Sequence, residues 1–209
     1  MTTRVTGIII GKKDFREADR MFVIYTKEHG KITALAQGCR KLSSKLSGNL
    51  ELLHHATFTI AHGKQINRIA TVDPIETHEA IKRNLDALTI ALYCCDLCDR
   101  SVQEGVADSA LYEHLKDFLS VCSQIQGAYV RTTQLFILKL ATLLGYRPPA
   151  KGYERIVSLL SQKGLSSAAD EKFPPGIESV VEGCLSSLIE RPIPAQIFFD
   201  FLSKKPALS

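Results

Sequence analysis

The sequence lacks the features that mark membrane and secreted proteins. None of its apolar runs reaches the length of about 18 residues that a membrane-spanning helix needs. The N-terminal apolar run is short, and Lys12 and Lys13 follow it where a signal peptide would need small residues for cleavage. These absences predict a cytoplasmic protein whose cysteines are reduced thiols.

Signatures of catalysis are missing as well. The chain contains no G-x-S-x-G elbow, no phosphate-binding G-x-x-x-x-G-K-[ST] loop and no H-E-x-x-H pair. Glu17 and Asp19 lie two residues apart and could form an acid–base pair, but the arginines directly before and after this segment favour a salt-linked loop. His54 and His55 are neighbours on a predicted strand, so they point to opposite faces and cannot share a metal. We therefore expect no enzymatic activity.

The six cysteines do not form paired metal-binding motifs. Cys95 and Cys98 make one C-x-x-C, whereas a structural zinc site normally takes four ligands from two such pairs. This motif lies within a predicted helix, so we interpret both thiols as small apolar groups in a helical core. A zinc or redox site is the alternative, with His114 or Cys122 as the additional ligand.

The excess positive charge lies in the N-terminal part of the chain. Residues 1–79 contain 12 Lys and Arg against 8 Asp and Glu, whereas residues 80–209 contain 14 of each kind. A basic module followed by a neutral one favours a polyanion-binding domain joined to a scaffold or partner-binding domain. An excess of this size also arises by chance, so charge alone leaves both interpretations open.

Before residue 76 the apolar pattern is short and strand-like. Ile32, Ala34 and Ala36 share one face of a predicted strand, and Gly30 is expected to supply the positive φ of the turn before it. Strands are predicted at residues 4–11, 21–26, 31–37, 52–61 and 65–73. Five short strands close most economically into a small barrel of the oligonucleotide-binding (OB) type, with an SH3-like barrel as the nearest competitor.

After Pro74 the spacing of the apolar residues becomes helical. The helix expected at residues 128–144 is apolar nearly all round, so we predict that it is central to its domain. Helices are predicted at residues 76–84, 85–104, 108–126, 128–144, 153–162, 177–190 and 194–203, with a loop at 163–175. The prediction is an α+β protein, with a five-stranded OB-fold barrel over residues 1–77 and an all-helical domain over residues 78–209.

A loop bounded by Gly38 and Gly48 contains three cations, Arg40, Lys41 and Lys45. Flexible backbone lets such groups converge on phosphates, so this loop is the leading candidate for binding a polyanion. The other candidate phosphate contacts in the barrel are Lys31, Arg20, Arg16, Lys12, Lys13 and Arg68.

Few aromatic side chains accompany these cations. The barrel segment contains only Phe15, Phe22, Tyr25 and Phe58. Phe22 and Tyr25 have opposite parity on one strand, so one of the two is expected in the core. Because single-strand binders of this fold usually stack bases on exposed aromatics, the scarcity predicts binding led by phosphate contacts. Such binding is steeply salt-dependent and accepts single and double strands.

Several segments together resemble the bacterial RecO family of recombination mediators. They are residues 16–20 (READR), 25–31 (YTKEHGK), 37–41 (QGCRK), 45–51 (KLSGNLE) and 143–146 (LLGY). The resemblance implies a non-enzymatic protein, with an OB barrel and a helical domain, that binds and anneals DNA in the cytoplasm at the nucleoid. It also implies RecR as a partner, contact with the acidic tail of the single-strand-binding protein, and help in loading RecA. By position, Arg40, Lys41 and Lys45 become the leading phosphate contacts, followed by Lys31 and Arg20.

The chain departs from the family pattern at several positions. Many relatives bind zinc through four cysteines just after the L-G-Y segment, but residues 147–155 (RPPAKGYER) contain no cysteine, so we expect no zinc. Gln37 stands where the family usually has lysine, and Gln134 and Leu135 replace a basic pair. The candidate substitutes for binding the acidic tail are Arg131, Lys139 and Arg147. A protein-interaction adaptor that keeps the fold, with weakened DNA or tail contacts, is therefore the alternative function.

Overall fold

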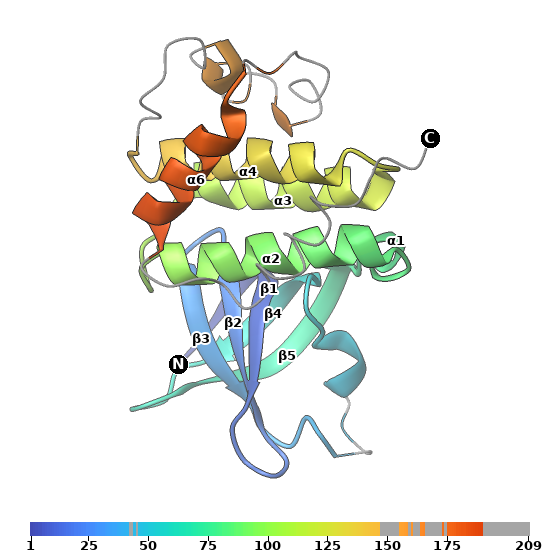
Figure 1. The fold of residues 1–209 in the computed structure, drawn as a ribbon. Helices are drawn as coiled ribbons and strands as arrows, with labels where there is room; N and C mark the ends of the chain where they lie inside the picture. The colour runs from blue at the N-terminus through green and yellow to red at the C-terminus, as the bar shows by residue number, and fades with distance from the viewer. Residues whose placement is uncertain are drawn as a thin grey trace. The chain divides into compact units, whose positions relative to one another are not determined.

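Five β-strands form the N-terminal part of the computed structural model (Figure 1). They are β1 (Thr2–Asp14), β2 (Arg20–Thr26), β3 (Gly30–Ala36), β4 (His55–Ala61) and β5 (Asn67–Glu76), with a short 3-10 helix, η1 (Ser47–Asn49), between β3 and β4. They close a barrel in the order β1-β2-β3-β5-β4, and only the β3–β5 pair is parallel. The OB-fold prediction is confirmed.

The structure describes residues 1–41, 44, 46–146, 155–158, 160, 164–165, 173 and 175–189. These residues divide into two units, which we call the barrel unit (Met1–His78 and Val102–Tyr112) and the helical unit (Glu79–Ser101 and Glu113–Ser209). Within the described residues, no helix is long and apolar enough to cross a membrane.

Strand β1 is longer than its apolar run because it pairs with two neighbours. Its first half, from Thr2 to Ile8, pairs with β4, and its second half, from Gly7 to Asp14, pairs with β2. The register shifts between Ile9 and Gly11, and a bulge of this kind bends a strand so that a barrel can close. The polar residues at the end of β1 are therefore strand residues, which the apolar pattern alone did not predict.

Alternation along the strands places one face of each in the barrel core. Ala34 and Ala36 are fully buried and Ile32 packs against them, as predicted. Phe22 belongs to the same core. The prediction that one of Phe22 and Tyr25 lies in the core is met by Phe22, but Tyr25, on the opposite face of the strand, is also only 1% exposed. The outer face of β2 is therefore covered at Tyr25, and this aromatic ring is not available to a ligand.

The segment Val102–Tyr112 packs on the barrel alongside the first half of β3. The N–H of Gly105 donates to the carbonyl of Lys31 at 2.8 Å, and Glu104 Oε1 accepts the N–H of Thr33 at 2.8 Å. Gly30 has the predicted positive φ, +64°, and a Cβ at this position would lie 1.9 Å from the carbonyl oxygen of Val106. Glycine is thus required here by both the turn and the close approach of two backbones.

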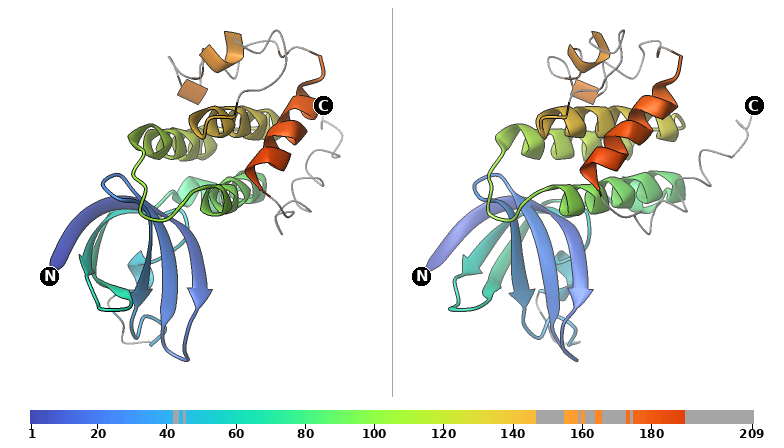
Figure 2. Two further views of the ribbon diagram at one scale, coloured as in Figure 1. Left: turned by 90° about the vertical axis from the view of Figure 1, so that its left-hand side faces the viewer. Right: turned by 60° about the vertical axis from the view of Figure 1, so that its left-hand side comes forward.

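The helices are α1 (Glu79–Lys82), α2 (Leu85–Ser101), α3 (Ser109–Gln124), α4 (Tyr129–Leu143) and α6 (Ile177–Leu188). Helix α6 packs against α4 and α2 (Figure 2). Helix α4 is central as predicted, because every residue from Thr132 to Leu138 is buried.

Two of the predicted helix boundaries are wrong. A helix beginning at residue 76 is excluded because β5 continues through Pro74 to Glu76, pairing with β4. A helix to residue 104 is excluded because Glu104 and Gly105 bond to β3 instead, so α2 ends at Ser101. The predicted helix at 194–203 and parts of the segments 153–162 and 163–175 lie outside the described residues.

Candidate nucleic-acid interface

The turn that follows β3 is fastened to the β1–β2 hairpin. Gly38 has a φ of +67°, and its N–H donates to Asp19 Oδ1 at 2.7 Å. The N–H of Arg40 donates to the carbonyl of Ala18 at 3.1 Å. Asp19 is buried, and its carboxylate serves this backbone contact, so the predicted salt link between Asp19 and its flanking arginines is wrong. We call the tip of this hairpin, residues 12–20, and the turn after β3, residues 37–41, together the cationic end of the barrel.

Asp14 joins two arginines at the cationic end. Arg20 Nε lies 2.7 Å from Asp14 Oδ1, and Arg40 Nη1 lies 3.4 Å from Asp14 Oδ2. The hydrogen bond from Arg20, helped by the charge of Arg40, lowers the pKa of Asp14, and the same hydrogen bond raises the pKa of Arg20. The carboxylate therefore gathers two guanidinium groups that remain partly exposed to solvent.

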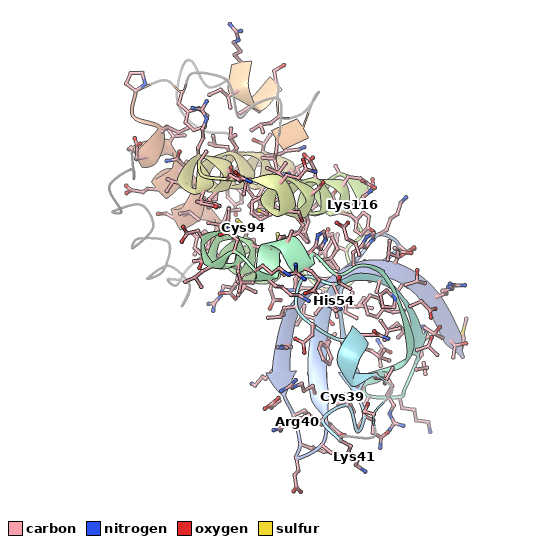
Figure 3. All side chains as sticks on the ribbon, turned by 90° about the vertical axis from the view of Figure 1, so that its right-hand side faces the viewer. Cys39, Arg40, Lys41, His54, Cys94 and Lys116 are labelled. Atoms are coloured by element: carbon pink, nitrogen blue, oxygen red, sulfur yellow. The ribbon has the colours of Figure 1, made fainter. Side chains whose placement is uncertain are left out.

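A polar pocket of about 250 Å³ opens beside these arginines. Lys12 Nζ lies 2.6 Å from Oε2 of Glu51, which lines the pocket. Cys39 also lines it and is 4% exposed, and burial raises the pKa of this thiol. The residues lining the pocket are Arg20, Phe22, Cys39, Arg40, Leu50 and Glu51. Figure 3 shows Cys39, Arg40 and Lys41 together at this end of the barrel.

Three further cations of the cationic end have no carboxylate partner among the described residues: Lys13, Arg16 and Lys41. All three are exposed. The guanidinium of Arg16 lies over the ring of Phe15, 5.2 Å from its centroid. The structure therefore brings six of the predicted phosphate contacts together, three of them paired with carboxylates and three without such a partner.

The remaining candidates of the barrel are not among these six. Lys31 pairs with Tyr25 at the start of β3, about 17 Å along the strand from Ala36 at its end. Arg68 is exposed near the start of β5 and pairs with Leu35, one residue before the end of β3. Lys45 lies outside the described residues.

Of the three cations proposed for the helical part, two are described. The guanidinium of Arg131 lies 4.1 Å from the ring centroid of Phe173, and its Nε and Nη2 have no hydrogen-bond partner among the described residues. Burial lowers the pKa of Lys139, and the nearby carboxylate of Asp117 opposes this shift. Arg147 lies outside the described residues.

The cysteines of the C-x-x-C motif are core residues, as predicted. Cys95 and Cys98 on α2 are each 1% exposed, and Cys122 on α3 is 2% exposed. Burial raises the pKa of Cys95 and of Cys122, whereas a metal site needs thiolates. His114, the other residue considered as a ligand, stacks on Phe136, and burial lowers its pKa to about 3.

These thiols lie on α2 and α3, away from residues 147–155, where the resemblance implies zinc ligands in relatives and where this sequence has no cysteine. Among the described residues, no three His, Cys, Asp or Glu side chains are arranged to hold a metal ion.

The sequence interpretation found the cations but missed the acids that organise them. Asp14 and Glu51 were not assigned a role, and Asp19 was assigned the wrong one. One signal was available for Asp14. If β1 is extended in the sequence up to the hairpin turn, Asp14 falls directly opposite Arg20 on β2, and directly opposite residues on antiparallel strands are neighbours.

Comparison with known families agrees with this architecture. The family model described as "Recombination protein O N terminal" matches residues 1–78, and the one described as "Recombination protein O C terminal" matches residues 82–151. The first model therefore covers the strands of the barrel, and the second covers α2, α3 and α4.

Individual relatives give the same result. A protein named DNA repair protein RecO from Acetivibrio thermocellus is 30% identical over 145 residues, which is 69% of this chain and 58% of the relative. Proteins of the same name from Symbiobacterium thermophilum and Roseiflexus sp. are 28% and 32% identical over 69% of this chain, and over 57% and 50% of their own lengths. The matched region thus spans between 50% and 58% of the length of these relatives.

Proposed function

Because the chain belongs to the RecO family of DNA repair proteins, we propose that it is a non-enzymatic, DNA-binding recombination mediator. In this proposal it binds single- and double-stranded DNA and anneals complementary strands, acting in the cytoplasm at the nucleoid. The observation that carries the proposal is the convergence of six Lys and Arg side chains on the cationic end of an OB barrel.

The cationic end provides a physical route to annealing. Two DNA strands repel each other through their phosphates, and a surface that neutralises part of this charge lets them approach. Lys13, Arg16 and Lys41 lead this contact because they are exposed and have no carboxylate partner among the described residues. Arg20 and Arg40 join it when a phosphate competes with Asp14.

The salt dependence of binding reports how many cations take part. For single strands the slope of log K against log salt is about −0.7 for each phosphate neutralised. Three unpaired cations therefore predict a slope of about −2, and all six a slope of about −4. A slope of about −2 would mean that Lys12, Arg20 and Arg40 stay paired with their carboxylates when DNA is bound.

The partners of the proposed mediator are RecR and the acidic tail of the single-strand-binding protein, and through them it assists RecA loading. Arg131 is the first candidate for the tail contact, because its Nε and Nη2 have no hydrogen-bond partner among the described residues; both atoms are buried, so an acidic tail would have to displace the groups that cover them. Lys139 is less favourable, since burial already lowers its pKa. We propose no zinc or other cofactor.

A second candidate function is a protein-interaction adaptor with weakened DNA contacts. The observation that favours it is the pairing of Lys12, Arg20 and Arg40 with carboxylates, which halves the number of unpaired cations. An adaptor of this kind would bind its protein partners but would not anneal strands at physiological salt.

Annealing of labelled complementary strands by a Lys13→Glu/Lys41→Glu variant tests the proposed function. Both side chains are exposed and unpaired with acids in the described structure, so the change removes phosphate contacts without breaking an internal ion pair. We expect annealing to slow at least about tenfold and the salt slope to fall by about 1 to 2. The matched control is Lys27→Glu, an exposed lysine at the turn between β2 and β3. Unchanged annealing in the double variant, or an equal loss in the control, would refute the site.

A further inference from the structure

The barrel unit exposes one aromatic side chain. Its five Phe and Tyr residues are all described, and four of them are at most 2% exposed: Phe22, Tyr25, Phe58 and Tyr112. Phe15 is 43% exposed. Single exposed apolar residues are common on protein surfaces, so the argument depends on how Phe15 is held and on what surrounds it.

Phe15 is held by an ordered turn at the tip of the β1–β2 hairpin. The N–H groups of Phe15 and Arg16 both donate to the carbonyl of Asp19, at 3.2 and 3.5 Å. Asp19 is fastened in turn to Gly38 through its carboxylate. A ring presented by such a turn loses little conformational entropy when a ligand stacks on it.

Cations surround Phe15 on the same hairpin. The Arg16 guanidinium lies 5.2 Å from the ring centroid, and Lys13 is exposed two residues before Phe15. Arg40 reaches this hairpin through Asp14 and through its own backbone bond to Ala18. A flat apolar surface beside several phosphate-binding groups matches a nucleotide, whose base is flat and whose phosphate is anionic.

We propose that Phe15 is a base-stacking platform that makes the cationic end of the barrel prefer single-stranded over duplex DNA. The inference rests on the proposed function, because it names the form of DNA that the same site takes. An unpaired base offers its face to an aromatic ring, whereas the bases of a duplex are already stacked on one another. Phosphate contacts are available from both forms, so Phe15 supplies the difference between them.

Equilibrium binding of labelled oligothymidine and of a hairpin duplex, at one salt concentration, tests this preference with the full chain. We expect Phe15→Ala to lose about tenfold in affinity for the single strand and to keep its affinity for the duplex. The matched control is Ile75→Ala, which removes an exposed apolar side chain of the same unit, 56% exposed, and should change neither affinity.

A Phe15→Trp variant gives a second readout, because the chain contains no tryptophan. Its single indole should retain single-strand affinity, and its fluorescence should be quenched by oligothymidine but not by the duplex. If Phe15→Ala leaves single-strand affinity unchanged, or weakens both forms equally, the platform is refuted while the DNA-binding function stands. If the unchanged protein binds neither form at low salt, the proposed function itself is refuted.

Discussion

Two backbone N–H groups, one in strand β3 and one just after it, each donate a hydrogen bond to a carboxylate, and the two contacts have different consequences. Just beyond the end of β3, the buried carboxylate of Asp19 accepts the N–H of Gly38 at 2.7 Å. In its first half, the exposed carboxylate of Glu104 accepts the N–H of Thr33 at 2.8 Å. The first contact joins two loops of the barrel, and the second joins the barrel to a segment that follows α2.

The difference lies in what each contact leaves exposed. Around Asp19 the loops expose cations, because the carboxylate is occupied by backbone while the side chains of Arg40 and Lys41 at this end remain exposed (Figure 3). Around Glu104 the backbone of β3 is covered, since the carbonyl of Lys31 accepts the N–H of Gly105. One part of β3 is thus arranged to meet a ligand, and the other to anchor the chain's own segment Val102–Tyr112.

Gly30→Ala should disrupt the packing of the segment Val102–Tyr112 on the first half of β3, which we call the anchored part. Of the variants considered, it should lower the free energy of unfolding most. A Cβ would lie 1.9 Å from the carbonyl oxygen of Val106, at a residue whose φ is +64°, so both the contact and the backbone must give way. We expect a loss of about 3 kcal/mol in the free energy of unfolding, measured by urea denaturation.

The control for this change is Gly48→Ala. A Cβ at Gly48 would meet no atom within 4 Å, and Gly48 does not have a positive φ. Its cost should stay within about 0.5 kcal/mol. Equal stability of the two variants would contradict the view that segment Val102–Tyr112 is anchored through Gly30.

The sequence predicted one of the two reasons for Gly30. A glycine after Glu28-His29 indicates a turn with positive φ, and this is a local property that sequence carries. The approach of Val106 joins residues far apart in the chain, and no local pattern predicts it. For the same reason the presence of the five strands was predicted, whereas the ends of β1 and β5 and the helix end at residue 104 were not.

The candidate site follows the same division. The cations were found because Lys and Arg side chains near predicted turns are exposed whatever the packing is. Their pairing with Asp14 and Glu51 depends on strand register and on the path of the loop after β3, which apolar alternation did not resolve. The burial of Tyr25 was not predicted, because the alternation of side chains along a strand indicates which face lies in the barrel core but not whether another segment covers the outer face.

Asp19→Ala should weaken the cationic end more than Glu104→Ala weakens the anchored part. Loss of the Asp19 carboxylate leaves the N–H of the half-buried Gly38 without its acceptor, at a cost of about 2 kcal/mol in the free energy of unfolding. Glu104 is exposed, so water can replace it at Thr33 and the loss should be below about 1 kcal/mol.

Asp19→Asn is the informative control for this pair. Its amide oxygen can accept the same hydrogen bond, so stability should recover most of the loss if the contact is what matters. Urea denaturation of the three variants decides the question. A larger loss for Glu104→Ala than for Asp19→Ala would reverse the ranking of the two contacts.

Asp14→Asn should have the smallest effect on stability and a clear effect on DNA binding. The lowered pKa of Asp14, caused first by the hydrogen bond from Arg20, means that its ion pairing stabilises the fold above the ordinary pKa of 3.8 and is lost as pH falls further. At neutral pH the pair is exposed to solvent, so its removal should hardly change the unfolding midpoint.

In the Asp14→Asn variant, Arg20 and Arg40 are no longer paired with this carboxylate and become available to phosphates. We therefore expect tighter binding of labelled oligonucleotides and a salt slope steeper by about 1.4, from two added contacts. Weaker binding by Asp14→Asn would mean that the carboxylate acts by positioning Arg20 and Arg40 for the phosphates, and not by competing with the phosphates for these arginines.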